Sequence, residues 1–430
     1  MYPDVSIWES GPLLSGEETQ NLCRVIRRSR RAFAAINKSA PSLLRMILPL
    51  CLKSPSIRHG LLSLGSSLSD RSPTDLYHYQ MALSQLRDEI NAAKANNLDI
   101  EWIHQLLASS LILSMFTLGQ CDGCSVQHVR GMVGIVRMAD QTLLASTPLG
   151  RFLMGASAWQ DISAFWLGRK QPSQKAWTSW MAHRVSAKAA GELTALETMT
   201  GYPESLVTII ADIAEFVDDN VHMAMHQSFS HDGQPTSLFS PQSAIVGQGA
   251  SDDLETSLKQ WAMPSPPSEL SSLGKLALRT AWETIRMAAF LYLWTSFGFH
   301  ANVLDPIRTD RQTLRDAYVA EIISNSQAII ELSSQQEITI GNALLWPLVT
   351  AGCGCSAGQN QHEQAILNLL YDLERLYTME HTKVIRKLLQ RLWKSRTSSL
   401  NRQQTFNSSG RPYISMHQIV TEMNKIVPLL

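Results

Sequence analysis

Apolar side chains recur every three or four residues along most of the chain, which is the period at which side chains share one face of an α-helix. No run of alternating β-branched and polar residues, the pattern of a half-buried strand, lies between turn signals. We therefore predict an all-α protein built as a multi-helix array. The predicted helices are 16–36, 41–52, 57–69, 73–95, 99–118, 125–144, 149–168, 185–199, 203–227, 270–299, 311–334, 338–351, 360–395 and 413–428.

Two polar stretches interrupt this pattern. The longer one, residues 229–268, is rich in Ser, Gly, Gln and Pro, and we predict a loop or lid with one short helix near 253–262. The other, residues 395–410, is predicted to be an exposed loop. The longer stretch separates an N-terminal helical half, 1–228, from a C-terminal half, 269–430, and we expect the halves to pack as one compact domain.

The composition indicates which cellular compartment and which classes of partner to expect. The 430 residues carry 37 basic and 37 acidic side chains, so no net field attracts the protein to nucleic acid or to an anionic membrane. No window of about 18 uninterrupted apolar residues occurs, and the N-terminus lacks the basic-then-apolar order of a signal peptide. Six scattered cysteines are too few for a secreted disulfide framework. We expect a soluble cytoplasmic protein that contacts neither nucleic acid nor membrane directly; assembly as a homodimer stays open.

The order of the apolar segments carries a resemblance to a known family. The segments are LPLCLKSPSIRHGLLSLGS (48–66), LYHYQMALSQLRDEI (76–90), HVRGMVGIVRMA (128–139), FLMGASAWQDISAFWLGRKQP (152–172), GYPESLVTIIADIAE (201–215), IRMAAFLYLW (285–294), LLWPLVTAGC (344–353) and VIRKLLQRLW (384–393). In this order they resemble the successive helices of the fungal-specific transcription factor domain, an all-helical region that usually follows a zinc binuclear cluster. The resemblance covers nearly the whole chain.

The zinc cluster itself is not found in this sequence. It requires six thiolates close together in sequence, whereas no two cysteines lie close together before residue 120. The chain therefore resembles the helical body without the part that reads DNA. Such a body implies either a regulator that acts through protein partners or a scaffold recruited to chemistry.

A second resemblance points to chemistry. Fungal humulene synthases are similar to this same helical domain, and that similarity implies a Mg²⁺-dependent sesquiterpene cyclase. Such an enzyme converts a prenyl diphosphate, here farnesyl diphosphate, to a cyclic hydrocarbon such as humulene. We take the cyclase as the main hypothesis, because the chain has neither the zinc cluster nor a net positive charge and is expected to be complete from helix to helix. A transcriptional regulator without a zinc cluster is the alternative.

An acidic helix is the candidate metal site. Asp212, Glu215 and Asp219 share one face of the predicted helix 203–227, and Asp218 lies at the edge of that face. Clustered carboxylates are either well solvated or shared around cations, and Mg²⁺ prefers carboxylate and diphosphate oxygens. Under the cyclase hypothesis these four residues bind Mg²⁺, because the run DDNVH resembles the DDxxD motif of class I terpene cyclases with histidine in the last position. The alternative is a solvated face beside a polar loop.

Further charged residues lie in apolar surroundings. Asp161, within AWQDISAFWLG, is expected either to join the metal site or to cap or pair with a neighbour. Arg169 and Lys170 directly follow the predicted helix 149–168 and are candidates to hold either that aspartate or the diphosphate.

The predicted helix 270–299 supplies the remaining candidates. Arg279 and Arg286 lie on roughly one face and are expected to bind either diphosphate oxygens or a buried carboxylate. Trp282 and Phe290 are assigned to the wall of a cavity, where aromatic faces would stabilise a carbocation. Simple core packing is the alternative. The predicted catalytic set is therefore Asp218, Asp219, Trp282, Arg286 and Phe290.

Overall fold

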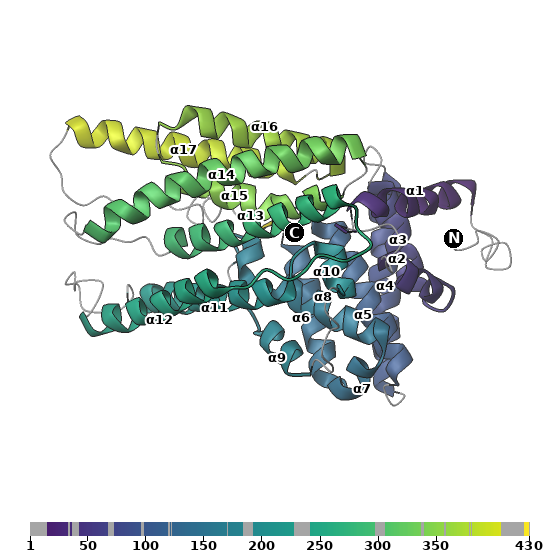
Figure 1. Cartoon of the computed structure of the whole chain (residues 1–430). Helices are drawn as coiled ribbons and strands as arrows, with labels where there is room; N and C mark the ends of the chain where they lie inside the picture. The colour runs from purple at the N-terminus through teal and green to yellow at the C-terminus, as the bar shows by residue number, and fades with distance from the viewer. Residues whose placement is uncertain are drawn as a thin grey trace. The chain divides into compact units, whose positions relative to one another are not determined.

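The computed structural model confirms the all-α fold. It describes residues 15–32, 35–36, 43–67, 73–95, 99–118, 121, 123–169, 171–183, 192–227, 241–296, 306–336, 339–356, 358–377, 379, 381–405 and 425–429. Within these ranges, helices α1 to α17 and a few short 3-10 turns make up nearly all of the regular structure, and the two strands have two residues each (Figure 1).

Contacts between Cα atoms divide the chain into two compact units that are interleaved in sequence. Unit 1 comprises Met1–Asp161, Ala176–Gly201 and Tyr377–His381. Unit 2 comprises Ile162–Lys175, Tyr202–Leu376 and Thr382–Leu430. The division into the halves 1–228 and 269–430 stays a prediction.

Unit 1 is a layered array of helices around α5. Its helices are α1 (Gly16–Ala32), α2 (Leu43–Ile47), α3 (Pro55–Ser67), α4 (Pro73–Ala95), α5 (Ile100–Leu118), α6 (Cys124–Met138), α7 (Gln141–Ser146), α8 (Pro148–Asp161), α9 (Ala176–His183) and α10 (Ala195–Thr200). Helix α5 is buried along most of its length, because α3, α4, α6 and α8 all pack against it. A helix enclosed by neighbours needs an apolar surface all round, which explains its run LLASSLILSMF.

A polar network lies inside unit 1. The carboxylate of Glu89 on α4 accepts hydrogen bonds from the hydroxyls of Ser54 (3.0 Å) and Ser56 (2.6 Å), and the Ser56 hydroxyl also lies 2.6 Å from that of Ser109 on α5. All four residues are buried. The carboxylate therefore sits at the N-terminus of α3, where the positive end of the helix dipole also favours a negative charge.

Unit 2 contains the remaining helices and both strands. They are α11 (Glu204–Gln227), α12 (Pro241–Gln260), α13 (Ser272–Ser296), α14 (Pro306–Gln336), α15 (Leu345–Gly354), α16 (Asn360–Tyr377), α17 (Thr382–Thr405), β1 (Trp166–Leu167) and β2 (Val427–Pro428). Helices α13, α14 and α15 pack against one another, α12 packs against α11 and α13, and α15 also contacts α17 (Figure 1). The strands pair antiparallel, with Trp166 opposite Pro428 and Leu167 opposite Val427.

Two predicted helices end early because the backbone turns extended. The segment predicted as 125–144 is two helices, since Ala139 is extended and the Asp140 side chain then caps α7 by accepting from the amides of Thr142 and Leu143. The segment predicted as 149–168 is helical only to Asp161, after which the chain forms a 3-10 turn and β1.

Other boundaries differ as well. The segment 229–268 was predicted to be a loop with a short helix, but it contains the 20-residue α12, which starts at Pro241, a residue suited to a first helical turn. The segment 360–395 is two helices, α16 and α17, and α17 continues through most of the predicted loop 395–410. Residues 425–428, predicted as the end of the helix 413–428, instead include β2; residues 406–424 lie outside the described residues.

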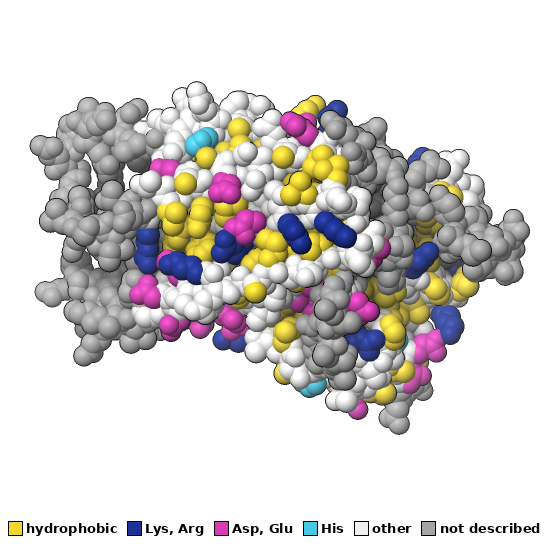
Figure 2. Space-filling model, in the orientation of Figure 1, with side chains coloured by type: hydrophobic (Ala, Val, Ile, Leu, Met, Phe, Trp, Pro, Cys, Tyr) yellow, Lys and Arg dark blue, Asp and Glu magenta, His cyan; other side chains and the backbone are white. Residues whose placement is uncertain are grey.

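The surface of the described residues is mixed in charge. Figure 2 shows basic and acidic side chains interleaved across one face, with apolar side chains between them. Among the helices of the described ranges, none combines the length and the hydropathy that crossing a bilayer requires.

Candidate functional site

The acidic residues of α11 contact a short loop that precedes α9. The Lys175 ammonium lies 3.2 Å from the Glu215 carboxylate, and Asp218 accepts a hydrogen bond of 3.3 Å from the amide of Ser173. Hydrogen bonding to Glu215 and the neighbouring carboxylates raise the pKa of Lys175. Asp212 and Asp219 are exposed. The face is thus solvated and partly neutralised by a lysine of the same unit, as the alternative interpretation expects.

Electrostatics within this face are mild. Partial desolvation, with a smaller contribution from the charge of Glu215, raises the pKa of Asp212. Within the described part of the chain, no three His, Cys, Asp or Glu side chains converge in a way that could hold a metal ion. Metal binding by Asp161, Asp212, Glu215, Asp218 and Asp219 stays a prediction.

Asp161 has a structural role at a helix terminus. It is the last residue of α8, its side chain is fully buried, and it accepts a hydrogen bond of 3.3 Å from the amide of Ala176. Ala176 is the first residue of α9, so the carboxylate caps the N-terminus of that helix. This is the capping role that the sequence left open.

The basic candidates are held by groups of the protein. Arg169 is buried and donates to the carbonyl of Pro172 at 3.2 Å, while Lys170 lies outside the described residues. Arg286 donates from Nε to Glu283 at 3.0 Å and from Nη1 to the carbonyl of Leu258 at 3.2 Å. Arg286 thus pairs with a carboxylate, one of the two roles expected for it.

Of the remaining candidates, Phe290 contacts Arg286, whose guanidinium carbon lies 5.8 Å from the centroid of its ring. Arg279 is exposed. Trp282 and Phe290 are buried at 1% and 2% exposure. The Phe290 ring packs against Trp294 and Tyr318, with ring centroids 5.4 and 5.7 Å apart. These contacts are those of core packing, the alternative interpretation of the two rings.

A groove on the surface of unit 2 is a second candidate for a binding site. It lies between α16 and α17, which form a helical hairpin. Near the connection the hairpin is held by Glu374, whose carboxylate accepts from Arg386 at 2.6 Å and from the Thr382 hydroxyl at 3.3 Å, with Lys383 at 3.4 Å. Away from the connection the two helices leave a surface groove between them, with a volume of about 460 Å³.

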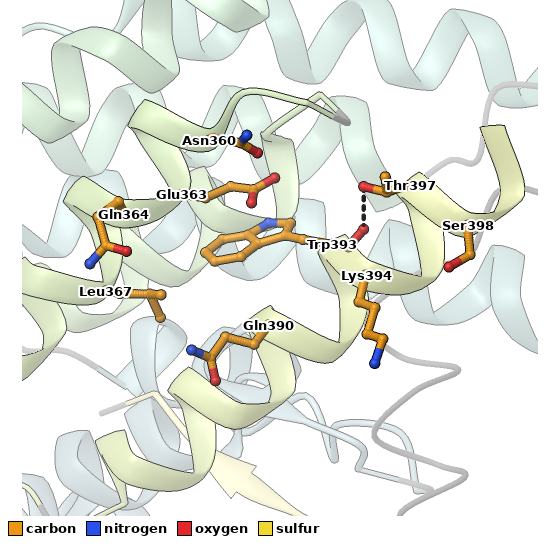
Figure 3. Close-up of a pocket in the computed structure, with 9 residues that line it drawn as sticks. All are labelled: Asn360, Glu363, Gln364, Leu367, Gln390, Trp393, Lys394, Thr397 and Ser398. Atoms are coloured by element: carbon orange, nitrogen blue, oxygen red, sulfur yellow. Dashed lines mark hydrogen bonds between the residues drawn. The ribbon is translucent and has the colours of Figure 1, made fainter. Parts of the chain in front are cut away.

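The lining follows the helical period on both helices. Side chains spaced by three or four residues share a face, and here the two facing rows are mainly polar and do not fill the seam. Figure 3 shows the lining residues: Asn360, Glu363, Gln364, Leu367, Gln390, Trp393, Lys394, Thr397 and Ser398.

The floor of the groove is fixed by α15. The Trp393 indole, 4% exposed, donates from Nε1 to the carbonyl of Gly352 at 2.8 Å. A Cβ at Gly352 would lie 2.8 Å from Cδ2 of Leu389, so only glycine lets α17 approach α15 this closely. Arg396 also caps the C-terminus of α15, because its Nη1 donates to the carbonyls of Cys353 (2.9 Å) and Cys355 (3.0 Å).

Glu363 is the charged group that faces this floor. It lies in the first turn of α16, where a carboxylate interacts favourably with the helix dipole. Partial burial raises its pKa, and the positive charge of Arg396 only partly opposes this effect. Among the residues that the structure describes, no side chain or amide donates to its carboxylate and none pairs with it as a cation.

Sequence reasoning did not find the groove. The segment 360–395 was interpreted as one continuous helix, which cannot fold back on itself to make a seam. The sequence did contain a sign of the groove, since polar residues recur at helical spacing on both segments. They are Asn360, Glu363 and Gln364 on the first segment and Gln390 and Lys394 on the second.

Comparison with known proteins decides between the two functional hypotheses. The model of the family described as "Fungal specific transcription factor domain" matches residues 31–424. Searches of curated proteins and of solved structures gave no significant match. The terpene cyclase hypothesis, with its farnesyl diphosphate and humulene assignments, was therefore wrong, because the match supports the regulatory alternative. With nearly its whole length covered, the chain belongs to the fungal specific transcription factor domain family.

Proposed function

We propose that the protein is a transcriptional regulator whose helical body acts through protein partners. Membership of the family over residues 31–424 carries this proposal. The zero net charge favours partner proteins over direct binding to nucleic acid, since binding to the phosphate backbone depends on an excess of basic side chains.

The groove between α16 and α17 is the surface through which we expect a partner to bind. Grooves between helices recur in the recognition of protein segments, and this one offers hydrogen-bonding side chains around an aromatic floor. Tryptophan is enriched among the residues that dominate binding at protein interfaces. Its position is rigid here, because Nε1 is bonded to the α15 backbone.

Tethering the full chain to a heterologous DNA-binding domain tests the proposal. Transcription from a reporter with matching sites is expected to change severalfold, up or down, relative to the DNA-binding domain alone. The double variant Glu363→Gln/Gln390→Ala should reduce that change. Asp372→Asn is the matched control, since Asp372 lies on the same helix, outside the groove lining, and faces Arg375 at 3.7 Å.

The result that contradicts the proposal is defined in the same assay. If the tethered chain is present at a normal level but leaves transcription at the level of the DNA-binding domain alone, the regulatory function is excluded in that host. If the groove variant and the control behave alike, regulation does not use this surface.

A further inference from the structure

We propose that the groove between α16 and α17 binds the guanidinium group of an arginine presented by a partner protein, with Glu363 as its counter-ion and Trp393 as its floor. This inference rests on the proposed function, since it names the chemistry of the partner at the same surface.

The first observation is an unpaired carboxylate in a partly desolvated position. Two other carboxylates of unit 2 are paired with arginines: Glu374 binds Arg386, and the buried Glu255 binds Arg311 at 3.1 Å. Glu363 accepts no hydrogen bond from the described residues. Partial burial raises its pKa, and the positive charge of Arg396 offsets this effect only in part. An incoming cation would offset the remaining effect.

The second observation is the direction of the nearby basic side chains. Figure 3 shows the Glu363 side chain reaching toward the Trp393 indole, whereas the Lys394 side chain points away from both. Arg396 contributes positive charge near Glu363, but its Nη1 is occupied by the carbonyls of Cys353 and Cys355. Of these two basic side chains, Lys394 points away from Glu363, and Arg396 is hydrogen-bonded to the C-terminus of α15.

The third observation concerns the rest of the lining. Gln364 donates from Nε2 to Asn368 at 2.9 Å, which leaves its carbonyl oxygen able to accept. Asn360 and Gln390 add two more amide oxygens at the rim. A guanidinium has five N–H donors and no acceptor, so a carboxylate with several amide oxygens around it is a suitable set of partners.

An arginine fits better than a lysine for two reasons. The guanidinium is planar and can bind a carboxylate through two parallel hydrogen bonds, whereas an ammonium is a compact, strongly hydrated charge. A volume of about 460 Å³ also has room for a long side chain together with part of the backbone that carries it.

The test uses the full-length protein with ¹⁵N-labelled tryptophan, and follows the indole N–H signals during titration with N-acetyl-L-arginine methylamide. We expect one indole signal to shift in a saturable way. N-acetyl-L-citrulline methylamide, a neutral probe of nearly the same shape, should give no saturable shift, and N-acetyl-L-lysine methylamide should bind more weakly than the arginine probe.

Variants identify the groups involved. Glu363→Gln should weaken arginine binding by about tenfold, as expected for the loss of one charge-assisted pair. Asp372→Asn, which removes the same charge from the same helix outside the groove, should leave the dissociation constant unchanged. Lys394→Gln should lower it, since it removes a competing cation from the groove. Circular dichroism and thermal unfolding of each variant show whether the fold is intact.

Three outcomes would overturn the inference. They are equal binding of the citrulline probe, an unchanged dissociation constant in folded Glu363→Gln, and the absence of any saturable shift with the arginine probe. A failure here leaves the reporter assay unaffected, and a failure of the reporter assay leaves probe binding measurable, so the two proposals fail separately.

Discussion

Ser56 donates a hydrogen bond of 2.6 Å to Oε2 of Glu89, and this bond joins the N-terminus of α3 to the middle of α4 inside unit 1. Ser54 and the Ser56 amide donate to the other carboxylate oxygen at 3.0 and 3.3 Å. Three donors, two hydroxyls and one backbone amide, therefore bind the two carboxylate oxygens of Glu89.

Replacing Glu89 should destabilise the protein more than its position on a polar helix suggests. Glu89→Ala removes the carboxylate that accepts from two buried hydroxyls and a buried amide, and we expect a loss of about 3 kcal/mol in the free energy of unfolding. Glu89→Gln keeps the volume and one acceptor, so its loss should be smaller, about 1 kcal/mol. Denaturant unfolding followed by circular dichroism measures both. The exposed neighbour Asp88, changed to Asn, should cost less than about 0.5 kcal/mol.

Asp161 should behave as a capping residue. Asp161→Ala removes the acceptor for the Ala176 amide at the start of α9, and we expect a loss of about 2 kcal/mol. Asp219→Asn, on the exposed part of the acidic face, should change stability by no more than about 0.5 kcal/mol. Equal effects of the two substitutions in thermal unfolding would contradict the structural role of Asp161.

Gly352 and Gly131 should respond to alanine in opposite directions, although both lie inside helices. At Gly352 the added Cβ would lie 2.8 Å from a methyl group of the fully buried Leu389, so Gly352→Ala should cost about 1 to 3 kcal/mol. At Gly131 the added Cβ meets nothing within 4 Å, and Gly131→Ala should stabilise the protein by about 0.5 to 1 kcal/mol. Chemical denaturation of both variants decides this, and a stabilised Gly352→Ala would show that α15 and α17 are not closely packed.

Acidification should destabilise the protein through a buried histidine. Burial lowers the pKa of His381 from 6.5 to about 4. Because the folded pKa lies below the unfolded value, the unfolded state takes up the proton first as the pH falls. The contribution of His381 is therefore intact above about pH 6.5 and is lost progressively between pH 6.5 and 4, on the order of 3 kcal/mol in total.

The variant His381→Leu isolates this contribution. Its free energy of unfolding should fall less steeply than that of the wild type between pH 6.5 and 4, measured by denaturant titration at several pH values. His183→Gln is the control, since His183 lies at the exposed end of α9 and should leave the wild-type slope unchanged. Parallel pH profiles for His381→Leu and the wild type would exclude the assignment.

The buried carboxylate of Asp161 shows how much the local sequence could predict. The capping role of Asp161 was foreseen as an option, because a carboxylate in apolar surroundings needs a donor wherever it lies. The partner itself, the Ala176 amide, could not be foreseen, since the intervening chain leaves α8 through an extended segment that the helical pattern did not predict.

The end of α16 at Tyr377 was not predicted, and it determines where the groove lies. Apolar residues continue at helical spacing on both sides of it, so periodicity alone predicted one helix over 360–395. The structure makes two helices there, and only that reversal brings Glu363 to the same groove as Trp393.

The sequence by itself determined the all-α class and the approximate position of most helices, because the spacing of apolar residues follows directly from the helical repeat. The order of the apolar segments carried the resemblance to the family, which the family model confirms. Tertiary structure alone decided which charged residues are solvated, which are paired and which face a groove. The physical reason is that the pairing of a side chain depends on residues distant in sequence, and these become neighbours only when the helices pack.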